Sequence, residues 1–448
     1  RFGGVPRDLP RAGWAAPAGR AVFARTQPDP PRRQADQHPD RWRTQRKALR
    51  RRHGDGGAAA QRADILAEVT GIFRSGDRPL LEGTSFKKGA VMLQLDDAEA
   101  QAIQALSKQW VQAQSIDKFY DEQGICHVVL PERGHLAPGL FCVGGDSHSP
   151  TGGAFGAYMF GIGATEMAGV LATGEIWIKV PETILMSWRN RLSAYVTAKD
   201  MMLAMCRKIG MGGGRYQAIQ YAGQTIQALS MQERMTLSNM AAELGAQAGL
   251  IAPDEATVAF VQAAGGKVPA NWRNFQIEAA ESAENVMQFD AASLEPQIAA
   301  PHSPENADSA DAFRNISFDV AYIGACTGAK YVDLAAAAEV LKGRRIAKNV
   351  TLKVAPASLR DQNRAAQDGI MQILQDAGAE FLANSCGICA GYGEDRLAEN
   401  QVCLSSTARN FKGRMGAPSS QVYLASPYTV AASAVTGRLS DPRQVMGG

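Results

Sequence analysis

Apolar and polar positions follow regular periods only from about residue 63 onward. A spacing of three to four residues indicates amphipathic helices, and short apolar runs indicate buried strands. In the first part of the chain the pattern predicts helices over 63–74, 98–114 and 235–245 and strands over 125–130, 140–143 and 176–180. The stretch Gly144–Gly174 holds nine glycines among 31 residues. Such a density lets the backbone approach a ligand or another segment closely.

Strands and helices alternate clearly after residue 317. The pattern there predicts strands over 318–323, 350–354, 380–383 and 422–425 and helices over 332–341, 364–376 and 426–435. This alternation is typical of an α/β fold with a parallel sheet covered on both faces, whose ligand crevice lies beyond the carboxyl ends of the strands. Residues 281–317 are polar and contain three prolines, so we expect a linker there.

Length and charge divide the chain further. At 448 residues it has room for about three domains, and we expect α/β units over 63–182, 183–280 and 318–448. Residues 1–62 carry 14 Arg and one Lys against five Asp, a net charge of +10, whereas the remainder carries −7. This arm has no stable apolar period and the chain starts with Arg, so we expect a disordered or aberrant start, with nucleic-acid binding as the alternative.

The composition, with 45% hydrophobic and 20% charged residues, is that of an ordinary soluble globular protein. The longest uncharged run, residues 149–165, is rich in glycine, so we expect no membrane span. No basic segment leads into an apolar stretch as in a secretory signal, and we expect a cytoplasmic protein. Seven cysteines are too few and too irregularly spaced for a disulfide framework, so we expect free thiols.

Three of these cysteines follow predicted strands. Cys326 comes after the strand at 318–323, and Cys386 and Cys389 come after the strand at 380–383. Loops that follow parallel strands share one edge of the sheet, so three thiolates can converge there. A redox pair, half of a zinc site and unrelated buried cysteines are the competing interpretations. An iron–sulfur cluster on three thiolates would leave one iron without a protein ligand and able to bind a hydroxyl and a carboxylate.

A second group of candidates lies in the glycine-rich stretch. Asp146, Ser147 and His148 are consecutive and cannot form one nucleophilic triad, because neighbours in extended backbone point to opposite sides. We expect separate roles: Asp146 orients an imidazole, for which His127 is the natural partner. Ser147 would donate to an anionic ligand, and His148 would shuttle or polarise a proton.

Charged and amide side chains supply the remaining candidates. Arg409 and Arg414 lie close together on a loop that contains glycine, and paired guanidinium groups suit a dicarboxylate substrate, although a solvated basic turn is the alternative. Asn239 and Glu243 are one helical turn apart and would supply an amide and a carboxylate if they face a cleft. The sequence has neither a dinucleotide fingerprint nor a phosphate loop, so we expect no nucleotide chemistry.

Five segments, in this order, resemble the aconitase superfamily: GGDSHSPTGGAFGAYMFGIGATEMAGVLATGE, MTLSNMAAELGAQAGLIAPDE, IGACTGAKYVDL, NSCGICAGYGEDRL and STARNFKGRMGA. Over about residues 63–443 the chain is similar to the branch of large subunits of 3-isopropylmalate dehydratase and relatives such as 2,3-dimethylmalate dehydratase. The resemblance implies three α/β/α lobes around a [4Fe-4S] cluster. It also implies a hydro-lyase that dehydrates and rehydrates a 2-hydroxy dicarboxylate, with isopropylmalate of leucine biosynthesis favoured over other alkylmalates or a homoaconitase-like substrate.

The resemblance also implies roles for individual residues. The cluster would be held by Cys326, Cys386 and Cys389. The catalytic pairs would be His127 with Asp146 and His148 with Glu243. Substrate or cluster contacts would come from Ser147, Asn239, Arg409 and Arg414. The catalytic base of the superfamily sits on a swivelling fourth domain, expected here on a separate small subunit, so we expect activity only in that complex.

The chain departs from the superfamily at several positions. Ala325 and Gly328 stand where relatives have serine and asparagine in the GACTG segment, and Ala408 stands where relatives have asparagine. The Asp-His pair that relatives carry upstream of the Asp-Ser-His motif is missing from residues 85–100. The missing pair leaves a catalytically dead homologue as an alternative to an enzyme. The superfamily resemblance and the basic arm leave RNA binding by a form without the cluster as another.

Overall fold

The computed structural model describes residues 98–275, 285–393 and 395–447. The basic arm, the predicted helix over 63–74 and most of the segment that lacks the Asp-His pair lie outside these residues. The first described element is the helix α3 (Ala98–Ala113), as predicted over 98–114. No helix in the described part of the chain combines the length and apolarity that crossing a membrane requires.

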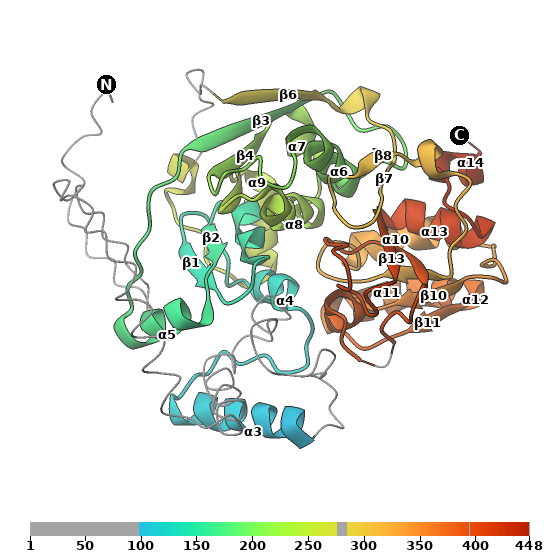
Figure 1. Ribbon diagram of the computed structural model, residues 1–448. Coiled ribbons are helices and arrows are strands. Elements are labelled where there is room, and N and C mark those ends of the chain that lie inside the picture. Colours follow the sequence, from blue (N-terminus) through green and yellow to red (C-terminus); the bar gives the residue numbers. More distant parts are fainter. Residues whose placement is uncertain (1–97, 276–284, 394, 448) are drawn as a thin grey trace, which may run out of the picture.

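Three sheets organise the described residues, and all but the edge of the largest are parallel (Figure 1). The first sheet pairs β1 (Phe141–Gly144) with β2 (Tyr158–Gly161). The second has the order β5-β4-β3-β6, with β3 (Thr183–Arg189), β4 (Ala218–Ala222), β5 (Ala248–Ile251) and β6 (Val286–Asp290). The third has the order β11-β10-β9-β12-β13-β7-β8, with β7 (Gln297–Ala299), β8 (Ala307–Ser309), β9 (Val320–Ile323), β10 (Thr351–Val354), β11 (Ala379–Phe381), β12 (Val402–Ser405) and β13 (Gln421–Ala425). The predicted α/β class with mostly parallel sheets is confirmed.

Two predicted strands near the first sheet are wrong. Residues 125–130 form the helix α4 (Cys126–Glu132), because a short, fully buried apolar run does not reveal its period. Residues 176–180 have no regular structure, and Trp177 is 75% exposed. The strand predicted over 140–143 is present as β1. The other elements around this sheet are the 3-10 helix η2 (Ser149–Phe155) and the helix α5 (Ala164–Thr173).

The glycine-rich stretch packs against the second sheet. A Cβ atom on Gly153 of η2 would lie 1.8 Å from the carbonyl oxygen of Gly249 in β5, so only glycine permits this approach. The helix predicted over 235–245 is split between α8 and a 3-10 turn. The helical elements of this region are α6 (Ala198–Ile209), α7 (Gln224–Ala228), α8 (Met231–Asn239), η3 (Met240–Leu244), α9 (Glu255–Ala263) and η4 (Trp272–Phe275).

The predicted alternation after residue 317 is confirmed, with two differences. The helix expected over 364–376 is broken at Gly369, which adopts a left-handed φ of +74°. The strand β12 was not predicted, because its apolar run is only three residues long and leads directly into a segment rich in serine and threonine. The helical elements here are α10 (Tyr331–Leu341), α11 (Leu359–Gln367), α12 (Ile370–Ala377), η7 (Gly387–Ala390), α13 (Pro427–Thr436) and α14 (Pro442–Met446).

The linker expected over 281–317 is a wrong prediction. Its described residues contain β6, which extends the second sheet, and β7 and β8, which add an antiparallel edge to the third. Two short 3-10 turns, η5 (Ala291–Ser293) and η6 (Ala310–Phe313), lie between and after these strands. Polar residues and prolines are compatible with short edge strands, and therefore did not distinguish a linker from a sheet edge.

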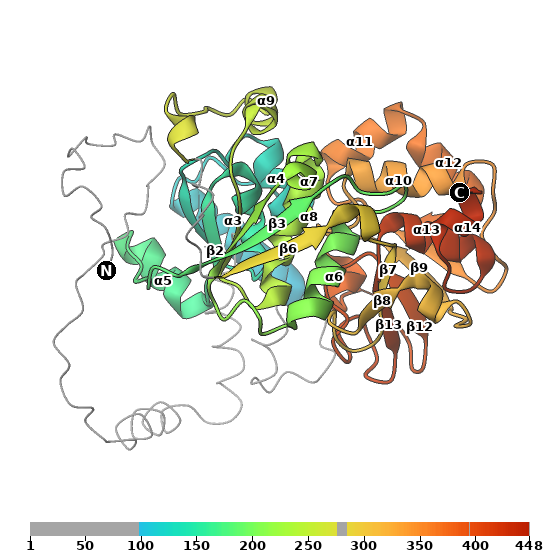
Figure 2. The same ribbon diagram turned by 90° about the horizontal axis from the view of Figure 1, so that it is seen from above.

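Two buried clusters hold the sheets together. One joins α4 and η2 to the helices and strands of the third sheet, and the other joins the second sheet and α6 to the opposite face of the third. The view from above shows β3 and β6 running toward the third sheet and its helices (Figure 2). The third sheet therefore packs against both other regions, and its strand ends lie where the three regions meet.

Candidate active site

The order of the third sheet brings separate loops together. The chain runs from β9 outward to β10 and β11, then returns to β12 on the other side of β9. Ligands bind at such a reversal, beyond the carboxyl ends of the strands. Cys326 follows β9, Cys386 and Cys389 follow β11, and Arg409 follows β12. The strand that sequence analysis missed therefore places the arginine loop beside the first cysteine loop.

The three cysteines form a buried group of free thiols. Cys326 and Cys389 are 7% and 6% exposed, and Cys386 is half-buried. Burial raises the pKa of Cys326 to about 11, and burial together with the charges of Cys389 and Cys326 raises the pKa of Cys386 well above 9. Asn239 Nδ2 donates to Cys326 Sγ at 3.1 Å, and Arg414 Nε donates to the carbonyl of Cys389 at 2.9 Å. Thiolates here need cationic partners: burial raises the pKa of Cys389 above 9, and the charge of Arg414 offsets part of that rise.

A buried serine holds the turn after β9. Ser406 Oγ accepts the N–H of Gly324 at 3.0 Å and donates to the carbonyl of Gly328 at 3.1 Å. The Ser406 carbonyl accepts from Thr327 Oγ1 and from Lys199 Nζ, both at 3.1 Å. One residue of the β12 loop thus fixes the cysteine turn and also receives an ammonium group from α6.

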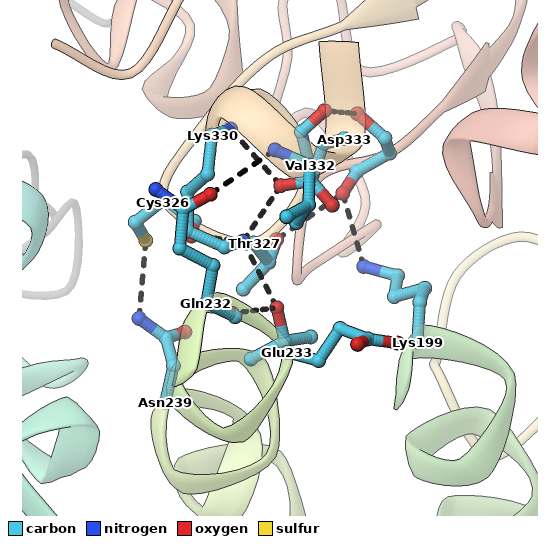
Figure 3. A network of polar contacts seen from close by, with 12 residues as sticks. Lys199, Gln232, Glu233, Asn239, Cys326, Thr327, Lys330, Val332 and Asp333 are labelled. Atoms are coloured by element: carbon cyan, nitrogen blue, oxygen red, sulfur yellow. Dashed lines mark hydrogen bonds and ion pairs between the residues drawn. The ribbon is translucent and has the colours of Figure 1, made fainter. Parts of the chain in front are cut away.

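Two buried lysines lie beside this turn. Lys330 Nζ donates to the carbonyl of Cys326 at 3.0 Å, to Thr236 Oγ1 at 2.9 Å and to Asp333 Oδ2 at 2.7 Å. Figure 3 shows this lysine beside the turn that carries Cys326, with the amide of Asn239 directed at the sulfur. Burial lowers the pKa of Lys199 to about 8. The charge of Lys330 is paired with Asp333, whereas the charge of Lys199 acts on Cys389 against the effect of burial, which suits an anionic centre.

On the other side of the site, His127 of α4 contacts Asp146. His127 Nε2 lies 2.7 Å from Asp146 Oδ1, which also accepts the backbone N–H of His148 at 2.7 Å. Burial disfavours the imidazolium, but the charges of Cys126 and Asp146 outweigh it and hold the pKa of His127 well above 6.5. The pKa of Asp146 is held well below 3.8, because His127 and the hydrogen bonds outweigh burial. The pair is therefore an imidazolium with a carboxylate. Ligand atoms of His127, Asp146 and His148 lie within 4.8 Å of one another, but a protonated His127 cannot ligate a metal ion.

A chain of polar contacts links His148 to the arginine loop. His148 Nε2 lies 3.2 Å from Glu243 Oε1, and Arg409 Nε donates to the same oxygen at 2.6 Å. Arg409 Nη1 donates to Ser147 Oγ at 2.9 Å. Glu243 is fully buried, and Arg409 and His148 lower its pKa against the effect of burial. Side chains from all three regions thus meet in one network.

The structure brings every site residue expected from sequence into this neighbourhood. Arg414 differs from Arg409 in its partner: its Nε donates a hydrogen bond to a backbone carbonyl of the cysteine turn. Sequence analysis missed Lys199, Lys330 and Ser406. The positions of Lys330, four residues after Cys326, and of Ser406, three before Arg409, were the available signals; periodicity alone does not reveal a buried lysine.

Three buried polar atoms in and beside this site lack hydrogen-bond partners. Asn239 Oδ1, Glu243 Oε2 and Tyr322 Oη have no hydrogen-bond partner among the described residues. Buried polar atoms are nearly always paired, so such a group needs an explanation. Three soft thiol ligands, nearby cations and these unpaired atoms fit an iron–sulfur cluster with a polar substrate beside it.

The profile of the aconitase family (aconitate hydratase) matches residues 81–312 and 306–437. The chain belongs to the aconitase family.

Two positions at which the chain departs from the aconitase-family segments lie in the turn after β9. Ala325 is buried at a left-handed φ of +69°. At Gly328, a Cβ atom would lie 2.2 Å from Ser406 Oγ, so the asparagine of relatives does not fit this turn as it stands.

Individual members of the aconitase family are similar over most of the chain. The 3-isopropylmalate dehydratase large subunit 1 of Methanopyrus kandleri is 42% identical over 349 residues, which are 78% of this chain and 83% of that protein. A protein of Methanosarcina mazei named "Probable methanogen homoaconitase large subunit" is 42% identical over 75% of this chain and 85% of its own length. The 3-isopropylmalate dehydratase large subunit of Aquifex aeolicus is 38% identical over 76% and 79%, respectively. A solved structure, aconitase X of Thermococcus kodakaraensis in its holo form, is 12% identical, with a TM-score of 0.42 over 70% of this chain and 72% of that one.

Proposed function

We propose that this chain is the large subunit of a [4Fe-4S] hydro-lyase that dehydrates and rehydrates a 2-hydroxy dicarboxylate. The observation that carries the proposal is the meeting of three thiols with two imidazole–carboxylate pairs at the strand reversal of the third sheet. A structural zinc site would need neither the imidazole pairs nor the unpaired polar atoms.

Cys326, Cys386 and Cys389 would hold the cluster, with Asn239 donating to the first sulfur and Arg414 bracing the third residue through its carbonyl. When bound, the cluster supplies a Lewis-acid iron without a protein ligand, which polarises the substrate hydroxyl. Lys330 and Lys199 keep the turn in place and balance negative charge.

His148 would protonate the departing hydroxide. In dehydration a C–O bond and a C–H bond break and a C=C bond forms, so the hydroxide must receive one proton to leave as water. Glu243 accepts from His148 and fixes the orientation of its ring. Asp146 holds His127 as an imidazolium, which supplies positive charge to the developing oxyanion.

Ser147 and Arg409 would bind a substrate carboxylate. Because Ser147 Oγ accepts from Arg409, its own proton remains to be donated to a carboxylate oxygen. The guanidinium adds positive charge at the same place, and its bond to Glu243 keeps it oriented. A dicarboxylate substrate matches this pair better than a neutral alcohol does.

The proton removed from carbon would go to a base on a separate small subunit. Relatives are named large subunits, which implies such a partner for them. We propose 3-isopropylmalate as the substrate, because relatives named for it match this chain over three quarters of its length. Homoaconitate is the second candidate, supported by the Methanosarcina mazei relative.

The test is anaerobic reconstitution of the full chain with iron and sulfide, followed by addition of a small subunit and assay against 3-isopropylmalate, 2,3-dimethylmalate and homoaconitate. We expect broad visible absorption from the cluster and the highest kcat/KM for 3-isopropylmalate. Cys386→Ala should lose both, whereas Cys206→Ala, at a buried thiol in α6 that is not one of the three proposed cluster ligands, should keep both. Absorption that is absent from the wild type, or unchanged in Cys386→Ala, would overturn the proposal.

A further inference from the structure

A buried phenol lies between two turns that carry cysteines. Tyr322 is in β9, the strand before Cys326, and is fully buried. Its ring lies against Gly324, where a Cβ atom would be 2.2 Å from Cζ and 2.3 Å from Oη. Only glycine at position 324 leaves room for the ring. The first cysteine turn therefore begins with a residue whose absent side chain accommodates this tyrosine.

The hydroxyl also lies close to the second cysteine turn. A Cβ atom on Gly387, between Cys386 and Cys389, would lie 3.9 Å from Tyr322 Oη. Burial and then the charges of Cys389 and Cys386 raise the pKa of Tyr322 well above 10. The hydroxyl therefore keeps its proton and can act as a hydrogen-bond donor.

This donor has no partner among the described residues. Leaving a buried hydroxyl unpaired destabilises the folded chain. A phenylalanine would fill the same space without that cost, so packing alone does not account for the oxygen. The two cysteine turns that flank it point to sulfur as the missing acceptor.

We propose that the Tyr322 hydroxyl donates a hydrogen bond to a sulfur of the cluster at the Cys386–Cys389 turn, and so raises its reduction potential and slows its loss. The inference rests on the proposed function, because it requires the cluster to be present. Hydrogen bonds to cluster sulfurs stabilise the more negative, reduced state, and they are one of the protein's means of setting the potential. Tyr322 is thus a positioning residue that does not touch the substrate.

The test compares Tyr322→Phe with the wild type and with Tyr221→Phe. Tyr221 is an equally buried tyrosine in β4, whose hydroxyl lies 3.7 Å from Met202 Sδ, away from the cysteine turns. In the reconstituted chain, Tyr322→Phe should shift the reduction potential to a more negative value, measured by titration followed by electron paramagnetic resonance. Its release of iron to a chelator should be faster by on the order of tenfold. Tyr221→Phe should change neither.

A second measurement separates this role from packing. Without the cluster, Tyr322→Phe should melt at the same temperature as the wild type or higher, because it removes an unpaired buried hydroxyl. With the cluster, it should melt lower. Equal potentials and equal iron release, or equal destabilisation with and without the cluster, would overturn this inference while leaving the proposed function intact. A wild type that takes up no cluster would overturn both.

Discussion

The two sides of the site are held in different ways. The cysteine side, formed by Cys326, Cys386 and Cys389 with their turns, is fixed by hydrogen bonds to backbone atoms, such as those made by Ser406 and Lys330. The imidazole side, formed by His127, Asp146, His148 and Glu243, is fixed by contacts between imidazole and carboxylate side chains. These contacts join residues of α4 and the glycine-rich stretch to η3 and to the β12 loop.

This difference indicates what each side tolerates. A turn fixed by backbone contacts is sensitive to changes of shape and φ, and less so to the loss of one charge. A network of buried charges is sensitive to the loss of any member, because the remaining charges are left without partners. Changes of charge should therefore disturb the imidazole side, and changes of shape the cysteine side.

The largest effect is expected for Glu243→Gln. The substitution keeps the shape but removes the charge that Arg409 and His148 share at 2.6 and 3.2 Å. We expect kcat/KM of the assembled enzyme to fall by about 10²- to 10⁴-fold and the free energy of unfolding to fall by about 3 kcal/mol. Steady-state kinetics and urea unfolding measure the two quantities.

The control is Glu182→Gln. Glu182 is an exposed carboxylate that accepts a hydrogen bond from Gln217, and its substitution should change stability by less than about 0.5 kcal/mol. A kcat/KM for Glu243→Gln within threefold of the wild type would contradict the assignment.

A smaller effect, with a distinct pH dependence, is expected for Asp146→Asn. The pKa of His127 should fall, because burial lowers it and, without the charge of Asp146, only Cys126 remains to raise it. The histidine contribution to wild-type stability is complete below its unfolded pKa of 6.5 and is lost as pH rises through its raised folded pKa. The aspartate contribution is present above its unfolded pKa of 3.8 and is lost as pH falls through its lowered folded pKa.

The stability difference between wild type and Asp146→Asn should therefore be greatest between pH 3.8 and 6.5. We expect a difference of about 2 to 3 kcal/mol in this window, shrinking on both sides of it. Urea unfolding across a pH series measures it. A difference that is independent of pH would show that the two groups are not a charged pair in the folded chain.

On the cysteine side, the addition of a single methyl group should disturb the turn that carries Cys326. Gly328→Ala places a Cβ atom 2.2 Å from Ser406 Oγ and 2.4 Å from its carbonyl oxygen, so the turn has to move. We expect a loss of about 2 kcal/mol in unfolding free energy and poorer uptake of iron. The matched control is Gly169→Ala in α5, where nothing lies within 4 Å of the added atom; it should be neutral or stabilising. Equal behaviour of the two variants would contradict a turn fixed by shape.

The smallest effect is expected for Ala325→Gly. Ala325 sits at φ +69°, which costs an alanine about 1 to 2 kcal/mol and a glycine almost nothing. After the greater entropy of glycine in the unfolded chain is subtracted, a net gain of about 0.5 kcal/mol should remain. The same substitution at Ala259, inside α9, should instead cost about 1 kcal/mol. Denaturant midpoints of the two variants should thus move in opposite directions.

Much of the third sheet could be predicted from the sequence, because short, buried strands alternate there with helices that have clear caps. Ser426 with Pro427, for example, marks the start of α13, and the structure places the cap there. The edge shared by Cys326, Cys386 and Cys389 follows from that alternation. The contact between His127 and Asp146 was predicted with His127 on a strand before the Asp-Ser-His motif; the contact is present, but His127 lies in the helix α4.

Other features depend on contacts that the local sequence does not reveal. The residues of α4 have the same apolar character as a buried strand, and only packing against the β10–α11 loop, where Ile125 N–H donates to Ala357 O at 2.9 Å, distinguishes them. The burial of Lys199 could not be predicted, because its partner, Ser406, lies 207 residues away in the chain. That β12 places the arginine loop beside the first cysteine loop follows only from the strand order of the third sheet.

The central claim is that the three thiols hold a cluster with one iron that has no protein ligand. Its most direct test is the iron and sulfide content of the anaerobically reconstituted chain before and after mild oxidation. We predict about four iron and four sulfide per chain, with selective loss of about one iron on oxidation, since three cysteines retain the other three. The variant that replaces Cys326, Cys386 and Cys389 by alanine should retain neither iron nor sulfide. The same iron content in that variant, or a wild type that binds zinc instead of iron and sulfide, would contradict the claim.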